Sequence, residues 1–305
     1  MSRQCAWLSP GVSLVIACFF WAAGTVISKQ LLNTVPPVLF LVLQLAPSAA
    51  ALWLFTLGRR IPLPRGVTLL WILVLGWLNP GLSYTLSMFG LVHASASVAS
   101  LMWAAEPIFI VVLAWWFLRE QISLPTIMLT TAATCGVYLA SGIGAEMVSL
   151  DAQATGAALI LCGVLCCAVY TVASRRIATD IDPVAIIAIQ QSVGLCWALC
   201  LLPFEPPGPG RSQLTDLTMP ELLGGVFSGL MYYALAFWFY LVGLRSMTAS
   251  RTGSFFNLIP VFGIGMAFMF LGERLSVTQW IGAATILISV SWLQALFARR
   301  RDAVT

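Results

Sequence analysis

The stretch His93–Glu120 reads HASASVASLMWAAEPIFIVVLAWWFLRE, and it decides the fold. It is long enough to cross a bilayer, since about 20 apolar residues suffice at a rise of about 1.5 Å per residue. It also carries a carboxylate, Glu106, and a proline, Pro107, where a wall facing lipid needs neither. Residues 246–273 read SMTASRTGSFFNLIPVFGIGMAFMFLGE, with a proline and a terminal glutamate in the same places. The chain therefore repeats itself at an offset of 153 positions.

The composition indicates an all-α membrane protein embedded in a lipid bilayer. Hydrophobic residues make up 60% of the 305 residues, charged residues 9%, and the mean hydropathy is +0.95. Soluble domains are about half apolar and a quarter charged. The basic residues are scattered over short segments between apolar runs, so they form no stripe that would bind nucleic acid.

Ten apolar runs predict ten transmembrane helices, and no soluble domain lies between them. We expect the first run to be a retained helix and not a removable signal peptide. The connections are short, except for a polar loop rich in proline and glycine at residues 203–220. The predicted spans are residues 10–28, 38–57, 68–90, 94–118, 124–141, 155–174, 184–202, 221–241, 252–271 and 277–297.

The repeat predicts two inverted halves. Nearer the start of each half the offset is 146, as in the pairs Pro37/Pro183 and Gln44/Gln190, and the long loop supplies the extra residues. Each half holds five helices, and because five is odd, homologous halves must cross the membrane in opposite senses. The predicted organisation is a first five-helix repeat at 1–145, an inverted second repeat at 153–298 and a basic tail at 299–305.

The distribution of Lys and Arg predicts the orientation. With the N-terminus inside, only Lys29, Arg211 and Arg274 fall outside, and the other twelve of the fifteen basic residues fall on the inner side. Cytoplasmic loops carry an excess of Lys and Arg, so both termini are expected in the cytoplasm.

The chain resembles the ten-helix branch of the drug/metabolite transporter (DMT) superfamily, whose five-helix halves are EamA domains. The segments behind this are Phe20–Gly24 (FWAAG), Glu106–Ser123 and Ile259–Ser276. The sixth predicted helix departs from the pattern, with Cys167 where the repeat would place Trp21. More loosely, the chain is similar to bacterial amino-acid exporters, notably the aromatic group. The resemblance implies amino-acid export by alternating access in a bacterial inner membrane.

Prolines suggest where a substrate binds. A proline inside a helix removes the hydrogen bond to the carbonyl four residues earlier, so Pro107 and Pro260 are predicted to free the carbonyls of Trp103 and Phe256. Such carbonyls should face protein or a water-filled cavity, here between the fourth and ninth helices. Alternatively, these prolines only shape the bundle. Pro80, in an Asn-Pro-Gly triplet, is a third break, and only the first half has it.

Three polar side chains are candidate substrate contacts. Glu106 is the only acidic residue predicted inside the hydrocarbon, where an ionised group costs about 2.5 to 3.5 kcal/mol. It is a proton site or a partner for a substrate ammonium, or else a protonated carboxyl bonded to a neighbouring helix. Asn257 is a ligand for a polar solute or an interhelical hydrogen bond. His93, the sole histidine, lies near the outer end of its helix, where it contacts substrate or is simply solvated.

Four aromatic residues are predicted deep enough to line a pocket: Tyr84, Trp103, Tyr232 and Phe256. An aromatic cavity would suit zwitterionic amino acids with apolar side chains, although Trp and Tyr in membranes commonly form interface belts. Gln44 and Gln190, equivalent in the repeat, are expected to join helices by hydrogen bonds. The pairs Cys162/Cys166 and Cys196/Cys200 are expected to be apolar filler, so no metal is predicted.

Three functions remain open from the sequence. The first is a transporter that exports neutral, especially aromatic, amino acids and related metabolites, with no cofactor and compatible with a monomer. The second is a transporter of sugar phosphates, nucleotide sugars, lipids or drug-like cations; phosphate substrates would favour basic residues on the cavity faces. The third, an intramembrane enzyme, lacks a zinc motif, a nucleophile elbow, a phosphate loop or paired carboxylates. We therefore predict no enzyme.

Overall fold

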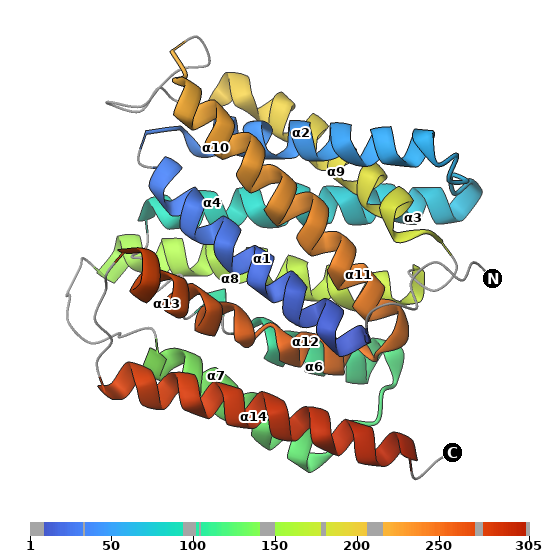
Figure 1. The fold of residues 1–305 in the computed structure, drawn as a ribbon, viewed down its shortest axis with the longest axis vertical. Helices are drawn as coiled ribbons and strands as arrows, with labels where there is room; N and C mark the ends of the chain where they lie inside the picture. The colour runs from blue at the N-terminus through green and yellow to red at the C-terminus, as the bar shows by residue number, and fades with distance from the viewer. Residues whose placement is uncertain are drawn as a thin grey trace. The chain divides into compact units, whose positions relative to one another are not determined.

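The computed structural model describes residues 9–32, 34–93, 102–103, 105–140, 150–177, 181–205, 216–271 and 277–302. Every regular element within these ranges is a helix, as Figure 1 shows. The all-α prediction is therefore confirmed for the described residues.

The chain divides into two compact units, each of which draws helices from both halves of the sequence. One unit comprises Met1–Thr85 with Ala173–Ser246, and the other comprises Leu86–Val172 with Met247–Thr305. We call them unit 1 and unit 2. Unit 1 contains α1 (Pro10–Leu31), α2 (Pro37–Gly58), α3 (Gly66–Gly76), η1 (Trp77–Leu82), α9 (Pro183–Leu201), η2 (Leu202–Phe204), α10 (Met219–Gly229), η3 (Leu230–Leu235) and α11 (Ala236–Ser246). Unit 2 contains α6 (Glu106–Leu118), α7 (Leu124–Ala140), α12 (Ala249–Phe255), α13 (Leu258–Leu271) and α14 (Val277–Asp302), while α4 (Ser83–His93) and α8 (Leu150–Ile177) continue from one unit into the other.

Five helices of the described chain are long and apolar enough to cross a membrane. They are Pro37–Gly58, Gly66–Gly90, Thr155–Arg175, Pro183–Phe204 and Met219–Ser246. Each coincides with one of the ten predicted spans. Shorter apolar helices occur at Pro10–Gly24, Glu106–Leu118 and Trp280–Leu293, within three further predicted spans.

Two of the long spans contain a π-helical turn at equivalent positions. In the first half, η1 contains the Asn79–Pro80 peptide, which is cis, and Asn79 has non-helical backbone angles. The break predicted at Pro80 is thus confirmed. The second half has no proline at the equivalent place, as expected, but η3 forms a π-helical turn there, 153 positions after η1.

In unit 1 these broken spans cross two other helices through glycines. A Cβ added to Gly76 would lie 2.6 Å from the Cα of Gln190 in α9, and one added to Gly229 would lie 2.7 Å from the Cα of Gln44 in α2. Gly76 and Gly229 are related by the offset of 153, and Gln44 and Gln190 by the offset of 146. The same close backbone contact therefore occurs twice, each time between helices from different halves of the sequence.

Two carboxylates fix the starts of the paired helices α2 and α9. Both oxygens of Glu205, just after η2, accept hydrogen bonds from the first turn of α2, from Val38 N–H at 2.7 Å and Leu39 N–H at 3.0 Å. Asp182 accepts from Val184 N–H at 2.9 Å at the start of α9. Negative charge at a helix N-terminus satisfies free amides and interacts favourably with the helix dipole.

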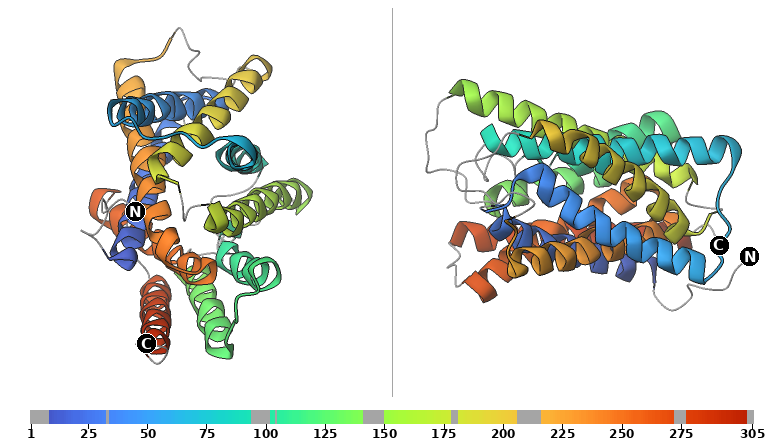
Figure 2. Two further views of the ribbon diagram at one scale, coloured as in Figure 1. Left: turned by 90° about the vertical axis from the view of Figure 1, so that its right-hand side faces the viewer. Right: turned by 90° about the horizontal axis from the view of Figure 1, so that it is seen from above.

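In unit 2, α7 and α14 pack side by side along their length (Figures 1 and 2).

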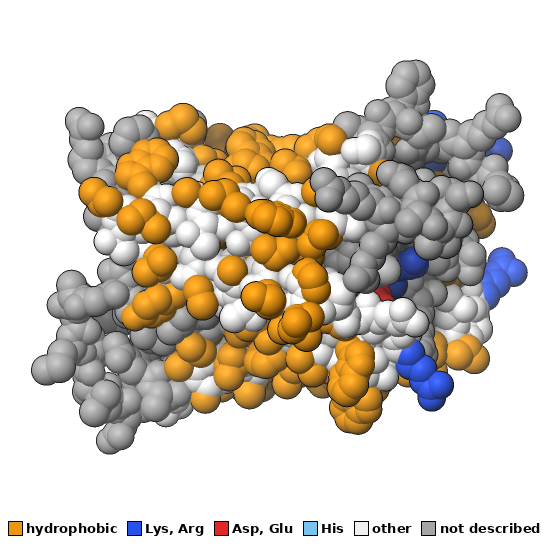
Figure 3. Space-filling view, turned by 90° about the horizontal axis from the view of Figure 1, so that it is seen from below, with side chains coloured by type: hydrophobic (Ala, Val, Ile, Leu, Met, Phe, Trp, Pro, Cys, Tyr) orange, Lys and Arg blue, Asp and Glu red, His pale blue; other side chains and the backbone are white. Residues whose placement is uncertain are grey.

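On the face shown in Figure 3, exposed apolar side chains form a broad band, and the coloured Lys and Arg side chains lie at one end of it. Large side chains are strongly exposed, among them Leu54 (74%), Trp116 (69%) and Trp292 (62%). Such exposure suits a surface that faces lipid.

The Gly229→Ala variant tests the crossing between α2 and α10. The new methyl group would overlap the backbone oxygen of Gln44, and such overpacking costs about 1 to 3 kcal/mol. We expect a lower melting temperature in detergent. Gly58→Ala is the control, because nothing lies within 4 Å of its added Cβ. Equal melting temperatures for the two variants would contradict the close crossing.

Candidate functional site

The structure distributes the predicted site residues over both units. Tyr84 and Tyr232 belong to unit 1, whereas Trp103, Glu106, Phe256 and Asn257 belong to unit 2. Pro80 belongs to unit 1 and Pro107 to unit 2. The side chains of His93 and Pro260 lie outside the described residues, although their backbones belong to α4 and α13.

In unit 2, α6 and α12 run antiparallel and are joined by Glu120. This glutamate follows the end of α6, and its carboxylate accepts from Ala249 N–H at 2.8 Å and from Ser250 N–H at 3.2 Å. The Ser250 hydroxyl donates to it as well, at 2.6 Å. The C-terminal end of α6 is thereby fixed against the N-terminal end of α12.

The packing further along these helices sets their register. A Cβ added to Gly253 in α12 would lie 2.9 Å from Ile110 in α6. Because the two helices run antiparallel, the residue one turn before Ile110 in α6 lies at the level of the residue one turn after Gly253, at the end of α12. Those positions are Glu106 and Asn257, so the register places the two predicted polar residues near the same level within unit 2.

Asn257 is buried with an acceptor oxygen that no described residue satisfies. Its side chain is 2% exposed, its Nδ2 donates to the carbonyl of Ser254 at 3.3 Å, and its Oδ1 has no hydrogen-bond partner in the described part of the chain. Asn257 immediately precedes α13, where a side-chain oxygen normally accepts from the second or third amide of the helix. The second amide, that of Ile259, donates to the Phe256 carbonyl, and the third residue, Pro260, has no N–H. The Asn257 oxygen is therefore available to another donor.

The same hydrogen bond corrects one expectation about the proline breaks. Pro260 was predicted to leave the Phe256 carbonyl free for a cavity. Instead, the Ile259 N–H donates to it at 3.0 Å, from three residues ahead. The tightened turn at Phe256 and Asn257 satisfies the backbone, and it leaves the side chain of Asn257 as the available polar group.

Glu106 lies in the first turn of α6 and is 8% exposed. No side chain caps the N-terminus of this helix. A carboxylate in the first turn interacts favourably with the helix dipole, but inside an apolar span it still requires a proton, a cation or water. Glu106 and Asn257 thus provide two acceptor groups near the same level of unit 2.

In unit 1, tyrosines from both halves of the sequence form a cluster. The Tyr232 hydroxyl lies 3.1 Å from that of Tyr84, and the two rings meet edge to face at 5.8 Å between centroids. Tyr233 packs against both rings, at 5.0 Å from Tyr232 and 5.6 Å from Tyr84. Tyr84 and Tyr232 are partly exposed, whereas Tyr233 is buried. Tyr84 and Tyr232, which were both predicted to lie deep in the bundle, thus contact each other directly.

A polar network behind this cluster includes one residue that sequence reasoning missed. The Gln191 amide donates to the carbonyl of Tyr233 at 2.6 Å, and the Ser48 hydroxyl donates to the Gln191 oxygen. A π-helical turn displaces the regular backbone bonds, so a carbonyl in η3 needs such a partner. The sequence signal was the adjacent pair of glutamines in an apolar span, of which only Gln190 was named.

Gln44 joins helices as expected. Its amide donates to the Ser28 hydroxyl in α1 at 3.0 Å and to the Ser228 hydroxyl in α10 at 2.7 Å. Trp103 packs against a small hydrophobic cluster formed by Ile160 and Val164 in α8. Binding of substrate by Trp103, Phe256 or His93 stays a prediction.

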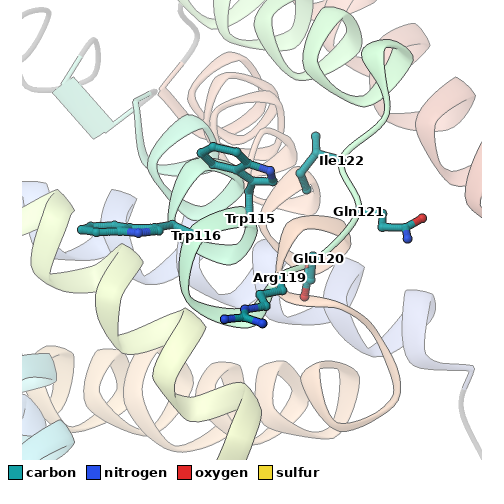
Figure 4. Close-up of a pocket in the computed structure, with 6 residues that line it drawn as sticks. All are labelled: Trp115, Trp116, Arg119, Glu120, Gln121 and Ile122. Carbon is teal, nitrogen blue, oxygen red and sulfur yellow. The ribbon is translucent and has the colours of Figure 1, made fainter.

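Figure 4 shows a pocket at a different place, around the end of α6. It is open, has a volume of about 450 Å³ and includes none of the predicted site residues. Its lining consists of Trp115, Trp116, Arg119, Glu120, Gln121 and Ile122. Within the described residues, no group of three or more His, Cys, Asp or Glu side chains could hold a metal ion.

The comparisons with known proteins agree on one family of membrane transporters. The model of the EamA-like transporter family matches residues 9–142 and 154–294. The uncharacterized transporter YetK of Bacillus subtilis is 23% identical over 284 residues, which cover 90% of this chain and 84% of that protein. An uncharacterized transporter of Archaeoglobus fulgidus is 25% identical over 288 residues, covering 92% and 96%. A solved crystal structure matches with a TM-score of 0.78 and 20% identity, covering 95% of this chain and 98% of that one, which supports the fold.

The Glu120→Ala variant tests the connection between α6 and α12. It removes the acceptor of three hydrogen bonds, and we expect a loss of about 1 to 2 kcal/mol of stability, measured as a lower melting temperature in detergent. Ser250→Ala removes only the hydroxyl bond and should have a smaller effect. A Glu120→Ala protein as stable as the wild type would show that the cap is dispensable.

Proposed function

We propose that this chain, which belongs to the EamA-like transporter family, exports amino acids and related small metabolites, with neutral and aromatic side chains preferred. The family and the names of the relatives make it a multi-pass membrane transporter and point away from an enzyme. The substrate class is inferred from the chemistry of the candidate site.

The pairing of Glu106 with Asn257 carries this proposal. An α-ammonium group has three N–H donors, and it would meet the Glu106 carboxylate and the free oxygen of Asn257. In a medium of low polarity, a carboxylate and a bound ammonium neutralise each other, which offsets the cost of placing either charge there. With no substrate bound, a proton on Glu106 would serve the same purpose.

Sugar phosphates and nucleotide sugars fit this arrangement poorly. Acceptor oxygens and a carboxylate repel a phosphate group, which favours Arg or Lys donors. The charge at Glu106 thus favours amino acids or other amines over anionic solutes. A drug-like cation remains the second candidate, because an amine without a carboxylate would satisfy Glu106 and Asn257 equally well.

The tyrosine cluster supports a preference for aromatic side chains. Tyr84 and Tyr232 are partly exposed and held by their mutual hydrogen bond. Their rings offer an edge and a face to an aromatic substrate, and aromatic pairs contribute about 0.5 to 1.5 kcal/mol beyond the area that they bury. We propose this pair as a contact of unit 1 for aromatic substrates.

Alternating access by inverted five-helix repeats is the proposed mechanism. It is supported by the twofold occurrence of the glycine crossings at Gly76 and Gly229 and of the π-helical turns η1 and η3. Repeats of this kind alternate by rocking one set of helices against another. The uneven distribution of Lys and Arg supports cytoplasmic termini in a bacterial inner membrane.

Transport in proteoliposomes tests the substrate class. Vesicles with the purified chain should exchange labelled phenylalanine, and other large neutral amino acids should compete. Phenylpropionate, which lacks the amine, should compete at least tenfold more weakly, since the ammonium contact would be missing. Competition by glucose 6-phosphate but not by amino acids would overturn the proposal.

The Glu106→Gln variant tests the ammonium contact. A neutral amide cannot balance the ammonium charge, so we expect at least a tenfold loss of phenylalanine transport with unchanged assembly in size-exclusion chromatography. Glu106→Asp keeps the charge and should retain part of the activity. Full transport by Glu106→Gln, at every pH tested, would leave Glu106 as a packing residue.

A further inference from the structure

The pocket at the end of α6 has the composition of a membrane interface. Trp115 and Trp116 are 62% and 69% exposed and line the pocket, together with Arg119, Glu120 and Gln121 from the end of the same helix (Figure 4). Exposed tryptophans at the end of an apolar helix lie at the level of the lipid headgroups. The pocket therefore opens toward phospholipids.

The charge of Arg119 is not used within the described protein. Its neighbour Glu120 directs both carboxylate oxygens to the N-terminus of α12. Arg119 is exposed, and no described residue forms an ion pair or hydrogen bond with its guanidinium. Because Glu120 is held by three donors, it leaves the guanidinium free to bind an external anion.

The backbone of Arg119 is also unusual for an arginine. Its φ is +53°, and its N–H bonds to the Ala114 carbonyl as the left-handed residue that ends α6. Glycine is the usual residue in this conformation, since a side chain there is strained. An arginine at this position costs backbone energy, so a role for its side chain would explain its presence.

We propose that this pocket binds the headgroup of an anionic phospholipid. The Arg119 guanidinium donates to the phosphate, a geometry in which it forms paired hydrogen bonds. The exposed indoles of Trp115 and Trp116 pack against the glycerol and the upper acyl chains. Because Glu120 links the same segment to α12, the bound lipid stabilises the junction of α6 and α12.

Native mass spectrometry of the full chain in detergent, with dioctanoyl phosphatidylglycerol or phosphatidylcholine added, tests this site. We expect the wild type to bind phosphatidylglycerol about fivefold more tightly, the effect of one basic residue at an anionic surface. In Arg119→Gly the preference should disappear. This variant should fold at least as well as the wild type, since glycine is favoured at a positive φ, and its melting temperature verifies that.

Arg60→Gly is the matched control. Arg60 is also exposed and left-handed, with φ of +51°, and is predicted on the same side of the membrane, but it is not part of the pocket. Its replacement should leave the lipid preference intact. An equal loss in both variants, or no preference in the wild type, would overturn the proposal. Lipid binding is measured without transport, so the outcome is independent of the proposed amino-acid substrate.

Discussion

Backbone amides and carbonyls at bilayer depth must find hydrogen-bond partners within the protein, because lipid offers none. This constraint explains the hydrogen bonds at two breaks in the described part of the chain. At the break before α13, Ile259 N–H satisfies the Phe256 carbonyl. At η3, the amide of Gln191 satisfies the carbonyl of Tyr233. The breaks are therefore positions where side chains and backbone share the available partners.

The candidate site is a consequence of the same constraint. Because Ile259 N–H is committed to Phe256 and Pro260 has no N–H, the buried oxygen of Asn257 is left available. Glu106, which lies near the level of Asn257 in the same unit, adds a second acceptor. A buried polar group without a partner is costly, and a substrate ammonium group or a proton would relieve this cost at both residues. In the proposed function, this unfavourable energy becomes affinity for a cationic ligand.

The repeated sequence has a structural counterpart that is only partly symmetric. The crossings of Gly76 with Gln190 and of Gly229 with Gln44 are the same contact made twice. The π-helical turns also coincide, yet they are stabilised differently: the first contains Pro80, whereas the second is bonded by Gln191. Two halves of different sequence can therefore keep one backbone geometry.

The sequence by itself determined that this chain is an all-helical membrane protein, because apolar runs of about 20 residues have few alternatives to a spanning helix. It also predicted the buried position of Glu106, the helix break at Pro80 and the interhelical hydrogen bonds of Gln44. Only the tertiary structure decided that Tyr84 meets Tyr232, that Gln191 supports a break without proline, and that helices from both halves build each compact unit. These features depend on contacts between residues more than 40 positions apart, and hydrophobic periodicity contains no information about which helices become neighbours.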